Sequence, residues 1–210
     1  MKTLKYIFMG ICVLVTFAAC DTKQDWIDTG VASPYHDCSI MEYLRRDKYN
    51  WELTVEMIER AGLTDLFEGN DPDYEEITFF ALPSYSVLRY LWDNDMETVN
   101  ELTPEFCREI LLKHVVKGKV LKSGIAYRNP DYVITDAKQD GGTELVCLGG
   151  NRLKAYVDKS SYGGVPDAGP ETMYLYSFSV RDHVPLATPD IQPLNGVVHA
   201  LNYNYVLGRI

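Results

Sequence analysis

An almost continuous apolar run close to the C-terminus constrains the fold of this chain most. The run Val197–Leu201 is interrupted only by His199 and follows the dipeptide Asn195-Gly196. Both residues of the dipeptide tolerate positive φ angles, so we expect a tight turn between two strands there. A strand this apolar needs neighbours on both faces, which places it inside the core and not at a sheet edge.

The first 20 residues have the organisation of an export signal. A positive region with two lysines is followed by Tyr6–Phe17, an apolar stretch too short to span a bilayer comfortably. Two alanines then precede Cys20. This pattern resembles the signal of a bacterial lipoprotein of the Bacteroidetes type. The resemblance implies that residues 1–19 are the signal peptide and that Cys20 carries the lipid, with an ordinary signal peptide as the alternative.

The charge of the chain limits its partners. Residues 20–35 are polar and lack periodicity, so they are interpreted as a tether to a domain that spans residues 36–210. Removal of residues 1–19, which hold two lysines and no acidic residue, lowers the formal net charge from −10 to −12. Such a charge disfavours nucleic acid and anionic lipid head groups. We expect no nucleic-acid partner, and membrane attachment through the N-terminal lipid only.

Helical patterns dominate the first half of the domain and strand patterns the second. Helices are expected at 40–47 with Ser39 as the cap, at 51–61, from the predicted cap Ser84, and from Pro104 to Lys117 with Thr103 as the cap. Strands are expected at 77–81, 119–121, 132–135, 143–148, 152–157 and 173–180, besides the closing pair. Two glycine pairs, Gly141-Gly142 and Gly149-Gly150, suggest hairpin turns. Because helices lead and strands follow, the fold class is α+β with one mixed core.

Three segments, in order along the chain, together resemble a known family. Ile77–Ser84 resembles a strand-into-helix motif of the T-x-F-A-P-x type, Leu111–Val120 an H-V-V-x-G-x-V segment, and Asp190–Leu201 an N-G-V-I-H-V-I closing strand. The family is the fasciclin (FAS1) domain, and the resemblance covers residues 36–210. It implies a FAS1-like β-sandwich or wedge with helices packed on it.

His114 has two interpretations. The resemblance implies a binding role, because His114 matches the second residue of a Tyr-His pair linked with integrin-type adhesion. Lys113 stands where many members carry the tyrosine, so the aromatic half of that pair is missing. The residues themselves favour a core histidine, because His114 lies on the apolar stripe of its expected helix. In that case its ring nitrogens should be hydrogen-bonded and Lys113 should be exposed.

Aromatic residues alternate along the strand expected at 173–180. Tyr174, Tyr176 and Phe178 share one face, whereas Met173 and Leu175 share the other. One interpretation of the aromatic face is an exposed platform for a glycan or protein partner. The local pattern favours the other interpretation, a strand buried on both faces, over it.

No pattern in the chain predicts catalysis, a metal or a cofactor. The four histidines show neither H-x-x-x-H nor H-x-H spacing, and both the phosphate-binding glycine loops and the nucleophile elbow are missing. Cys38, Cys107 and Cys147 form no C-x-x-C pair. They are expected to be small buried residues, with one disulfide between two of them as the alternative.

The lipoprotein signal and the FAS1 resemblance imply a non-enzymatic binding or adhesion module of the cell envelope. It would be lipid-anchored to the outer membrane of a Gram-negative bacterium, facing either the surface or the periplasm. Its partner would be a protein or a glycan. The alternative is an accessory component of a surface glycan-uptake complex that binds a polysaccharide or a partner lipoprotein.

Overall fold

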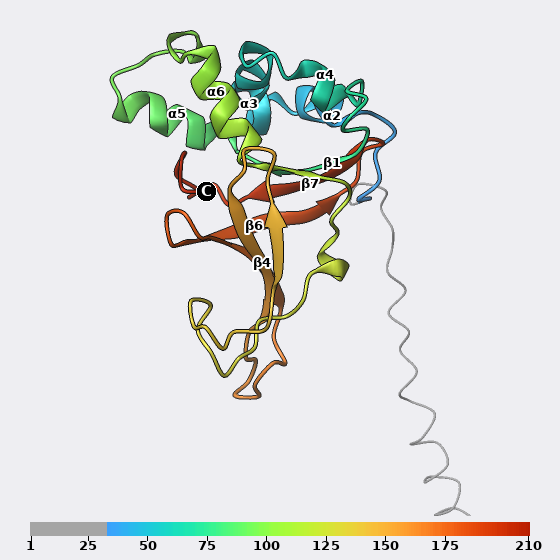
Figure 1. Cartoon of the computed structure of the whole chain (residues 1–210), viewed down its shortest axis with the longest axis vertical. Helices are drawn as coiled ribbons and strands as arrows, with labels where there is room; N and C mark the ends of the chain where they lie inside the picture. The colour runs from blue at the N-terminus through green and yellow to red at the C-terminus, as the bar shows by residue number, and fades with distance from the viewer. Residues whose placement is uncertain (1–32) are drawn as a thin grey trace, which may run out of the picture. The chain divides into compact units, whose positions relative to one another are not determined.

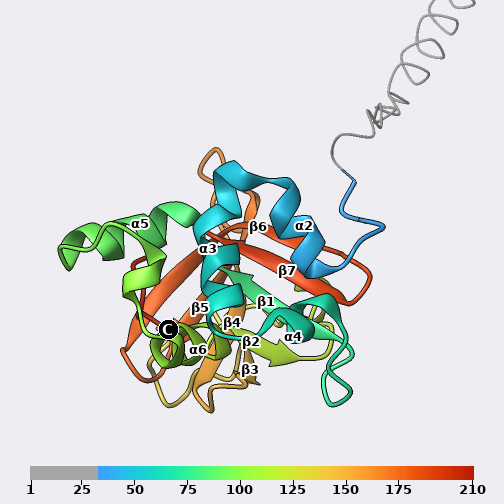
Figure 2. The ribbon, with the colours of Figure 1, turned by 90° about the horizontal axis from the view of Figure 1, so that it is seen from above.

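Seven strands form one sheet, and the helices gather over one end of it (Figures 1 and 2). The structure is a computed structural model that describes residues 33–210, of which Pro34–Ile210 form a compact unit. The strands are β1 (Ile77–Ala81), β2 (Val115–Lys117), β3 (Thr143–Val146), β4 (Arg152–Lys159), β5 (Glu171–Ser177), β6 (Asp182–Ile191) and β7 (Gly196–Leu201). Their order across the sheet is β2-β1-β7-β6-β5-β4-β3. The expected signal peptide, Cys20 and the tether up to residue 32 lie outside the described residues.

The apolar closing strand lies in the interior of the sheet and not at an edge, as its sequence predicts. β7 pairs in parallel with β1 and antiparallel with β6, and all six of its residues are buried. β1 and β7 approach so closely at Gly196 that an added Cβ would collide with the carbonyl oxygen of Ile77. Glycine is therefore required at this position for steric reasons.

The two outer strands of the sheet approach each other. Val116 of β2 forms an antiparallel bridge with Cys147, just after β3. The amides of Leu148 and Gly149 donate to the carbonyl oxygens of Val115 and Leu112, each over 2.8 Å. The sheet therefore curls almost into a barrel, which satisfies backbone groups that an open edge would expose.

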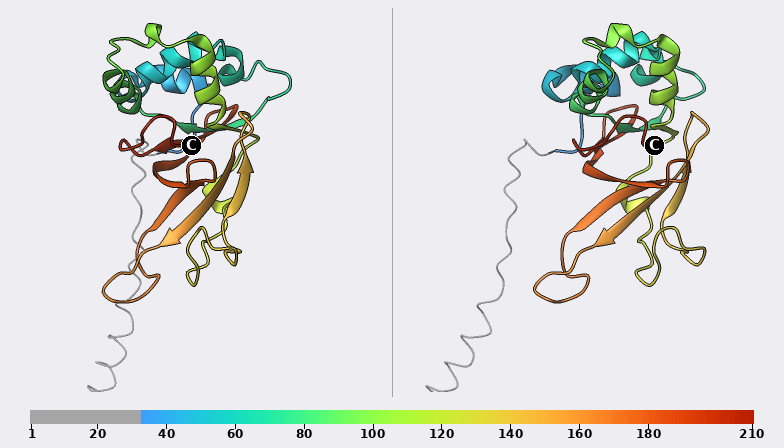
Figure 3. Two further views of the ribbon diagram at one scale, coloured as in Figure 1. Left: turned by 60° about the vertical axis from the view of Figure 1, so that its left-hand side comes forward. Right: turned by 90° about the vertical axis from the view of Figure 1, so that its left-hand side faces the viewer.

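The helices lie at one end of the domain, and the long loops of the strand region lie at the other (Figure 3). They are α2 (Ile40–Arg46), α3 (Lys48–Arg60), α4 (Thr64–Glu68), α5 (Ser84–Asp93) and α6 (Pro104–Leu112), with 3-10 turns η1 (Val99–Glu101) and η2 (Lys122–Gly124). The caps Ser39 and Thr103 function as the sequence predicts, since each hydroxyl accepts a hydrogen bond of 3.1 Å from an amide of the first turn. Within the described part of the chain, no helix is both long and apolar enough to cross a membrane.

Asn195 connects the turn before β7 to the helical layer. Its side-chain nitrogen donates to the carbonyl oxygen of Phe67 over 3.0 Å, and its side-chain oxygen accepts from the amide of Ile40 over 2.7 Å. Ile40 is the first residue of α2, where a helix has no backbone partner for its amides. Asn195 thus caps the N-terminus of α2 and holds Phe67, the residue before the last one of α4.

The helix expected from Pro104 to Lys117 is shorter than predicted. α6 ends at Leu112, and Val115–Lys117 form β2, where Val115 pairs with Phe79 of β1. The strand expected at 119–121 is also wrong, because this segment leads into η2. The β-branched residues Val115 and Val116 suit a strand, and their pairing with β1 makes this segment a strand and not a continuation of the helix.

Three further local predictions are wrong. Residues 132–135 form turns instead of a strand. The side chain of buried Gln139 holds this loop, because its nitrogen donates to the carbonyl oxygens of Asn129 and Tyr132. Gly141-Gly142 precede β3 without forming a hairpin, whereas Gly149-Gly150 do turn β3 into β4. The cap of α5 is Pro83 in place of Ser84.

The three cysteines of the domain are free and buried. Cys38, Cys107 and Cys147 are each at most 3% exposed and form no disulfide. The interpretation as small buried residues is confirmed, and burial raises the pKa of all three thiols. They are therefore protonated and unreactive at neutral pH.

Candidate binding site

His114 lies in the interior, two residues beyond the end of α6. It is 0% exposed. Its Nδ1 lies 2.7 Å from the carbonyl oxygen of Ile110, and its Nε2 lies 2.8 Å from the hydroxyl of Tyr205. A carbonyl oxygen only accepts, so Nδ1 carries the proton and Nε2 accepts from Tyr205. These are the bonds expected of a core histidine; its direct role in binding stays a prediction.

The electrostatics of this pair favour uncharged groups. Burial lowers the pKa of His114 from 6.5 to about 4, and the charge of Lys113 acts in the same direction. Burial likewise raises the pKa of Tyr205, which keeps its hydroxyl protonated. Lys113 is half-buried, not exposed as predicted, and its ammonium pairs with Glu109 over 2.6 Å.

His199 is a second buried histidine that joins separate segments. Its Nδ1 accepts from the backbone amide of Asp190 over 3.1 Å, so its Nε2 carries the proton and donates to the carbonyl oxygen of Val120 over 2.8 Å. Burial lowers its pKa. The one polar residue of β7 therefore connects β6 to the segment after β2, and it is not accessible to a ligand.

The predicted aromatic face is covered over part of its area by the protein itself. Tyr176 is 4% exposed and packs with Tyr156 and Ile134, which comes from the loop before β3. Tyr174 is half-buried and stacks on Tyr156 at 5.4 Å between ring centroids. Phe178 lies beyond the end of β5 and is 40% exposed. The structure thus brings these aromatic residues together, but leaves no continuous open platform.

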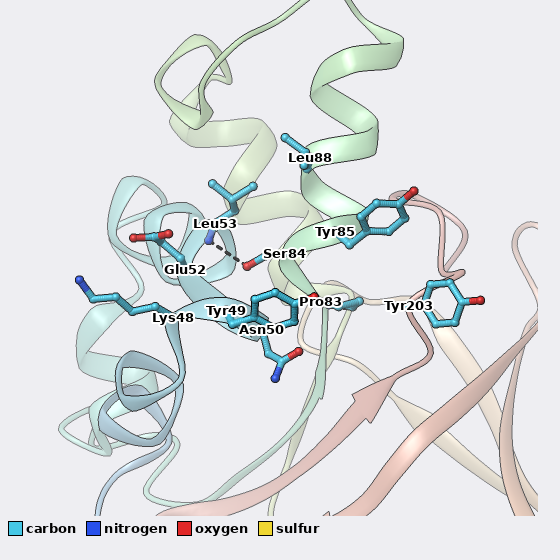
Figure 4. Close-up of a pocket in the computed structure, with 10 residues that line it drawn as sticks. All are labelled: Lys48, Tyr49, Asn50, Glu52, Leu53, Pro83, Ser84, Tyr85, Leu88 and Tyr203. Atoms are coloured by element: carbon cyan, nitrogen blue, oxygen red, sulfur yellow. Dashed lines mark hydrogen bonds between the residues drawn. The ribbon is translucent and has the colours of Figure 1, made fainter.

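An open pocket lies elsewhere, between the first turns of α3 and α5 (Figure 4). Its volume is about 680 Å³. Leu53, Pro83 and Leu88 contribute apolar surface, and the remaining lining residues are Lys48, Tyr49, Asn50, Glu52, Ser84, Tyr85 and Tyr203. We call this feature the tyrosine pocket.

Three tyrosines in this pocket present aromatic surface to solvent. Tyr49, Tyr85 and Tyr203 are 92%, 47% and 63% exposed. Their hydroxyls form no hydrogen bond with another described residue. The rings of Tyr85 and Tyr203 lie 6.4 Å apart, and the guanidinium of Arg89 covers the Tyr85 ring at 4.9 Å. Large exposed aromatic rings grouped in a concave site are typical of a binding surface.

The charged groups of the pocket are also unpaired. Neither Lys48 nor Glu52 forms an ion pair or a side-chain hydrogen bond within residues 33–210, although Arg45 and Arg46 on the preceding helix are both paired. The side-chain nitrogen of Asn50 donates to Asp47 over 2.6 Å. Its side-chain oxygen accepts from no described donor. A ligand would therefore meet free donors and acceptors beside apolar rings.

Hydrogen bonds between the helices fix the walls of the pocket. The Ser84 hydroxyl, in the first turn of α5, accepts from the amide of Leu53 in α3 over 3.1 Å (Figure 4). One residue further along α3, the buried Thr54 hydroxyl donates to the carbonyl oxygen of Leu82 over 2.6 Å. One bond links α3 to the first residue of α5, and the other links α3 to the connection between β1 and α5. The site is therefore preformed, which lowers the entropic cost of binding.

A solved structure is similar to this chain over most of its length. It is described as a FAS1 domain pair from the insect cell adhesion molecule fasciclin I, with a TM-score of 0.51 and 16% sequence identity over 77% of this chain. The fold is FAS1-like. This confirms an α+β domain with helices packed on a nearly closed sheet. The match covers 46% of that chain, so the present protein spans under half of its length. No protein-family model and no curated protein matches the sequence.

The FAS1-like domain offers no obvious metal centre. Among the described residues, no group of three or more His, Cys, Asp or Glu side chains could hold a metal ion. Asp73, Glu75 and Glu76 line a separate depression together with Lys117. The tyrosine pocket itself contains neither histidine nor cysteine.

Sequence reasoning missed the tyrosine pocket. Its three tyrosines come from the start of α3, the start of α5 and the segment after β7, which only the fold brings together. The sole signal was compositional, since the chain holds 15 tyrosines. The aromatic residues that the sequence does group, on one face of β5, contact one another and form no open platform.

Proposed function

We propose that this protein is a non-enzymatic binding module of the fasciclin type, anchored by a lipid on Cys20 to the outer membrane of a Gram-negative bacterium. It recognises a protein or glycan partner in the cell envelope. The single observation that carries the proposal is the tyrosine pocket, a concave site with exposed aromatic rings, in which Lys48 and Glu52 have no ionic partner among residues 33–210. The fold similarity to a domain pair of an adhesion molecule agrees with it.

The serine of the pocket is not arranged as an activated nucleophile. Ser84 is the one serine in its lining, and its hydroxyl accepts a hydrogen bond from a backbone amide. No described histidine or carboxylate contacts that hydroxyl, so no general base activates it. The two most shielded histidines, His114 and His199, are held by hydrogen bonds in the interior. Binding is therefore the activity that this geometry supports.

A role in a surface glycan-uptake complex is the second candidate. The same exposed tyrosine rings support it, because a sugar can stack on them. In that role the domain would hold a polysaccharide near a transporter. The two functions differ in the partner that the tyrosine pocket recognises.

The anchor is tested by metabolic labelling. Radiolabelled palmitate should enter the wild-type protein and the Cys38→Ala variant, whose thiol is buried in the domain, but not Cys20→Ala. Equal labelling of all three would refute lipidation at Cys20. Protease treatment of intact cells then distinguishes the surface from the periplasmic face.

Binding is tested with cell envelopes. Protein extracted from membranes in mild detergent and immobilised on beads should retain specific material from an envelope fraction. Retention should fall when Tyr49 and Tyr203 are both replaced by Ala, and should persist when the exposed Tyr162 is replaced instead. Equal retention by all three proteins would place the interaction outside the pocket, and absence of retention would refute the proposed function.

A further inference from the structure

We propose that the tyrosine pocket binds a neutral oligosaccharide through stacking on Tyr49, Tyr85 and Tyr203. The inference rests on the proposed binding function and specifies its ligand class. Aromatic stacking, charge balance and a preformed site of suitable size support it independently.

The exposed rings match the apolar faces of sugars. A pyranose ring presents C–H groups on its faces and hydroxyls at its periphery, so its face can lie on a tyrosine ring. Tyr49 and Tyr203 are 92% and 63% exposed, so a stacked sugar would remove much aromatic surface from water. Each tyrosine has only two side-chain torsions to immobilise, which keeps the entropic cost of stacking low.

The polar groups of the pocket suit a ligand that carries hydroxyl groups and no net charge. Figure 4 shows Lys48 and Glu52 on one side of Pro83, with Tyr85 and Tyr203 on the other. The two charged residues have opposite signs and neither has an ionic partner among residues 33–210. A hydroxyl can donate to the Glu52 carboxylate and accept from the Lys48 ammonium. A neutral ligand with many hydroxyls therefore satisfies both.

Charged ligands fit less well. A sulfated or uronic acid-containing glycan would meet the Glu52 carboxylate and a chain whose formal net charge is −10. A basic peptide would meet Lys48 in the pocket. An anionic lipid surface is disfavoured by the same overall charge, and among glycans the neutral class fits the pocket best.

The size of the site suits a short oligosaccharide. A volume of about 680 Å³ lies within the range of roughly 300–1,000 Å³ that is usual for small-molecule sites. The rings of Tyr85 and Tyr203, 6.4 Å apart, belong to different segments of the chain. The bond between Ser84 and Leu53 holds the α3 and α5 walls in place before the ligand arrives.

The test uses full-length protein extracted in mild detergent. Binding is measured by calorimetry with hexasaccharides of maltose, cellulose, laminarin and mannan type, and with oligogalacturonate and a heparin hexasaccharide as acidic comparators. The variants are Tyr49→Ala and Tyr203→Ala. The control is Tyr162→Ala, because Tyr162 is 73% exposed and lies outside the pocket, in the loop between β4 and β5. All three side chains are at the surface, so each variant should fold.

We expect at least one neutral hexasaccharide to bind. Its affinity should fall by roughly tenfold in each pocket variant, as for the loss of one stacked ring, and should be unchanged in Tyr162→Ala. If all variants bound the oligosaccharide as the wild type does, the tyrosine pocket would not be the binding site. The proposed binding function would not be affected by that result. Binding of the acidic oligosaccharides alone would overturn the ligand class. Absence of any saccharide binding would overturn this inference, whereas the envelope-retention assay tests the proposed function separately.

Discussion

At the scale of single residues, His114 shows how a polar group is accommodated in an apolar core. Both ring nitrogens have partners, Ile110 and Tyr205, at 2.7 and 2.8 Å. His114→Ala would leave both partners unsatisfied and create a cavity, so it should lower the free energy of unfolding by about 2–4 kcal/mol. Urea denaturation at pH 7 measures this change.

Lys113→Ala is the control for that experiment. It removes only a partly exposed ion pair with Glu109, so the expected change is below ~1 kcal/mol. If His114→Ala left the unfolding curve unchanged and abolished envelope binding, the histidine would be functional and not structural.

The protonation of His114 predicts a pH dependence of stability. Because burial lowers its folded pKa from 6.5 to about 4, the unfolded chain binds the proton more readily. The contribution of the neutral histidine is fully present above about pH 6.5 and is lost as the pH falls towards 4, by roughly 3 kcal/mol. Urea midpoints for wild type should therefore fall more steeply between pH 7 and pH 4.5 than those of His114→Gln. Parallel curves would contradict the prediction.

The sequence identified the burial of these histidines but not their partners. His114 and His199 lie within apolar runs, and this local pattern is enough to predict an interior position. Tyr205 and Val120 are distant in sequence, so the pairs exist only after folding. The same limit hid the tyrosine pocket, whose members are surface residues without a periodic pattern.

At the scale of elements, caps and turn residues made α2, the start of α6 and β7 predictable, whereas α4 was not predicted and the boundaries inside apolar runs were not predictable. Leu111–Val116 suits a buried helix or a buried strand equally well. Pairing between Val115 and Phe79 settles the choice, and it depends on a strand more than thirty positions away. Where the ambiguity was absent, as at Ile77–Ala81, prediction and structure agree.

Replacing Asn195 tests how much the hydrogen bonds between the helices and the turn before β7 contribute to stability. Asn195→Ala leaves the Ile40 amide and the Phe67 carbonyl oxygen without their partner and should cost about 1–3 kcal/mol. Leu194→Ala, in the same turn, removes a side chain that is 67% exposed and should change stability by less than ~0.5 kcal/mol. Equal thermal unfolding of the two variants would show that the bonds of Asn195 contribute nothing.

At the scale of the whole molecule, the segment after β7 serves both the core and the tyrosine pocket. Tyr205, Leu207 and Ile210 are 4%, 6% and 2% exposed, whereas Tyr203 is 63% exposed and lines the pocket. The segment also supplies the partner of His114. A change in this segment can therefore affect stability or binding, depending on which side chain it removes.

Truncation separates these two roles. A chain that ends at Asn202 loses three buried side chains worth roughly 1.5–3 kcal/mol each, and the sum approaches the whole stability of a typical domain, about 5–15 kcal/mol. We expect it to lack a cooperative thermal transition by circular dichroism. Tyr203→Ala removes only exposed surface, so it should melt like wild type while losing affinity for the ligand of the pocket. A truncated chain that melted at the wild-type temperature would show that the core is complete without this segment, and the pocket would then need only α3 and α5 to keep its shape.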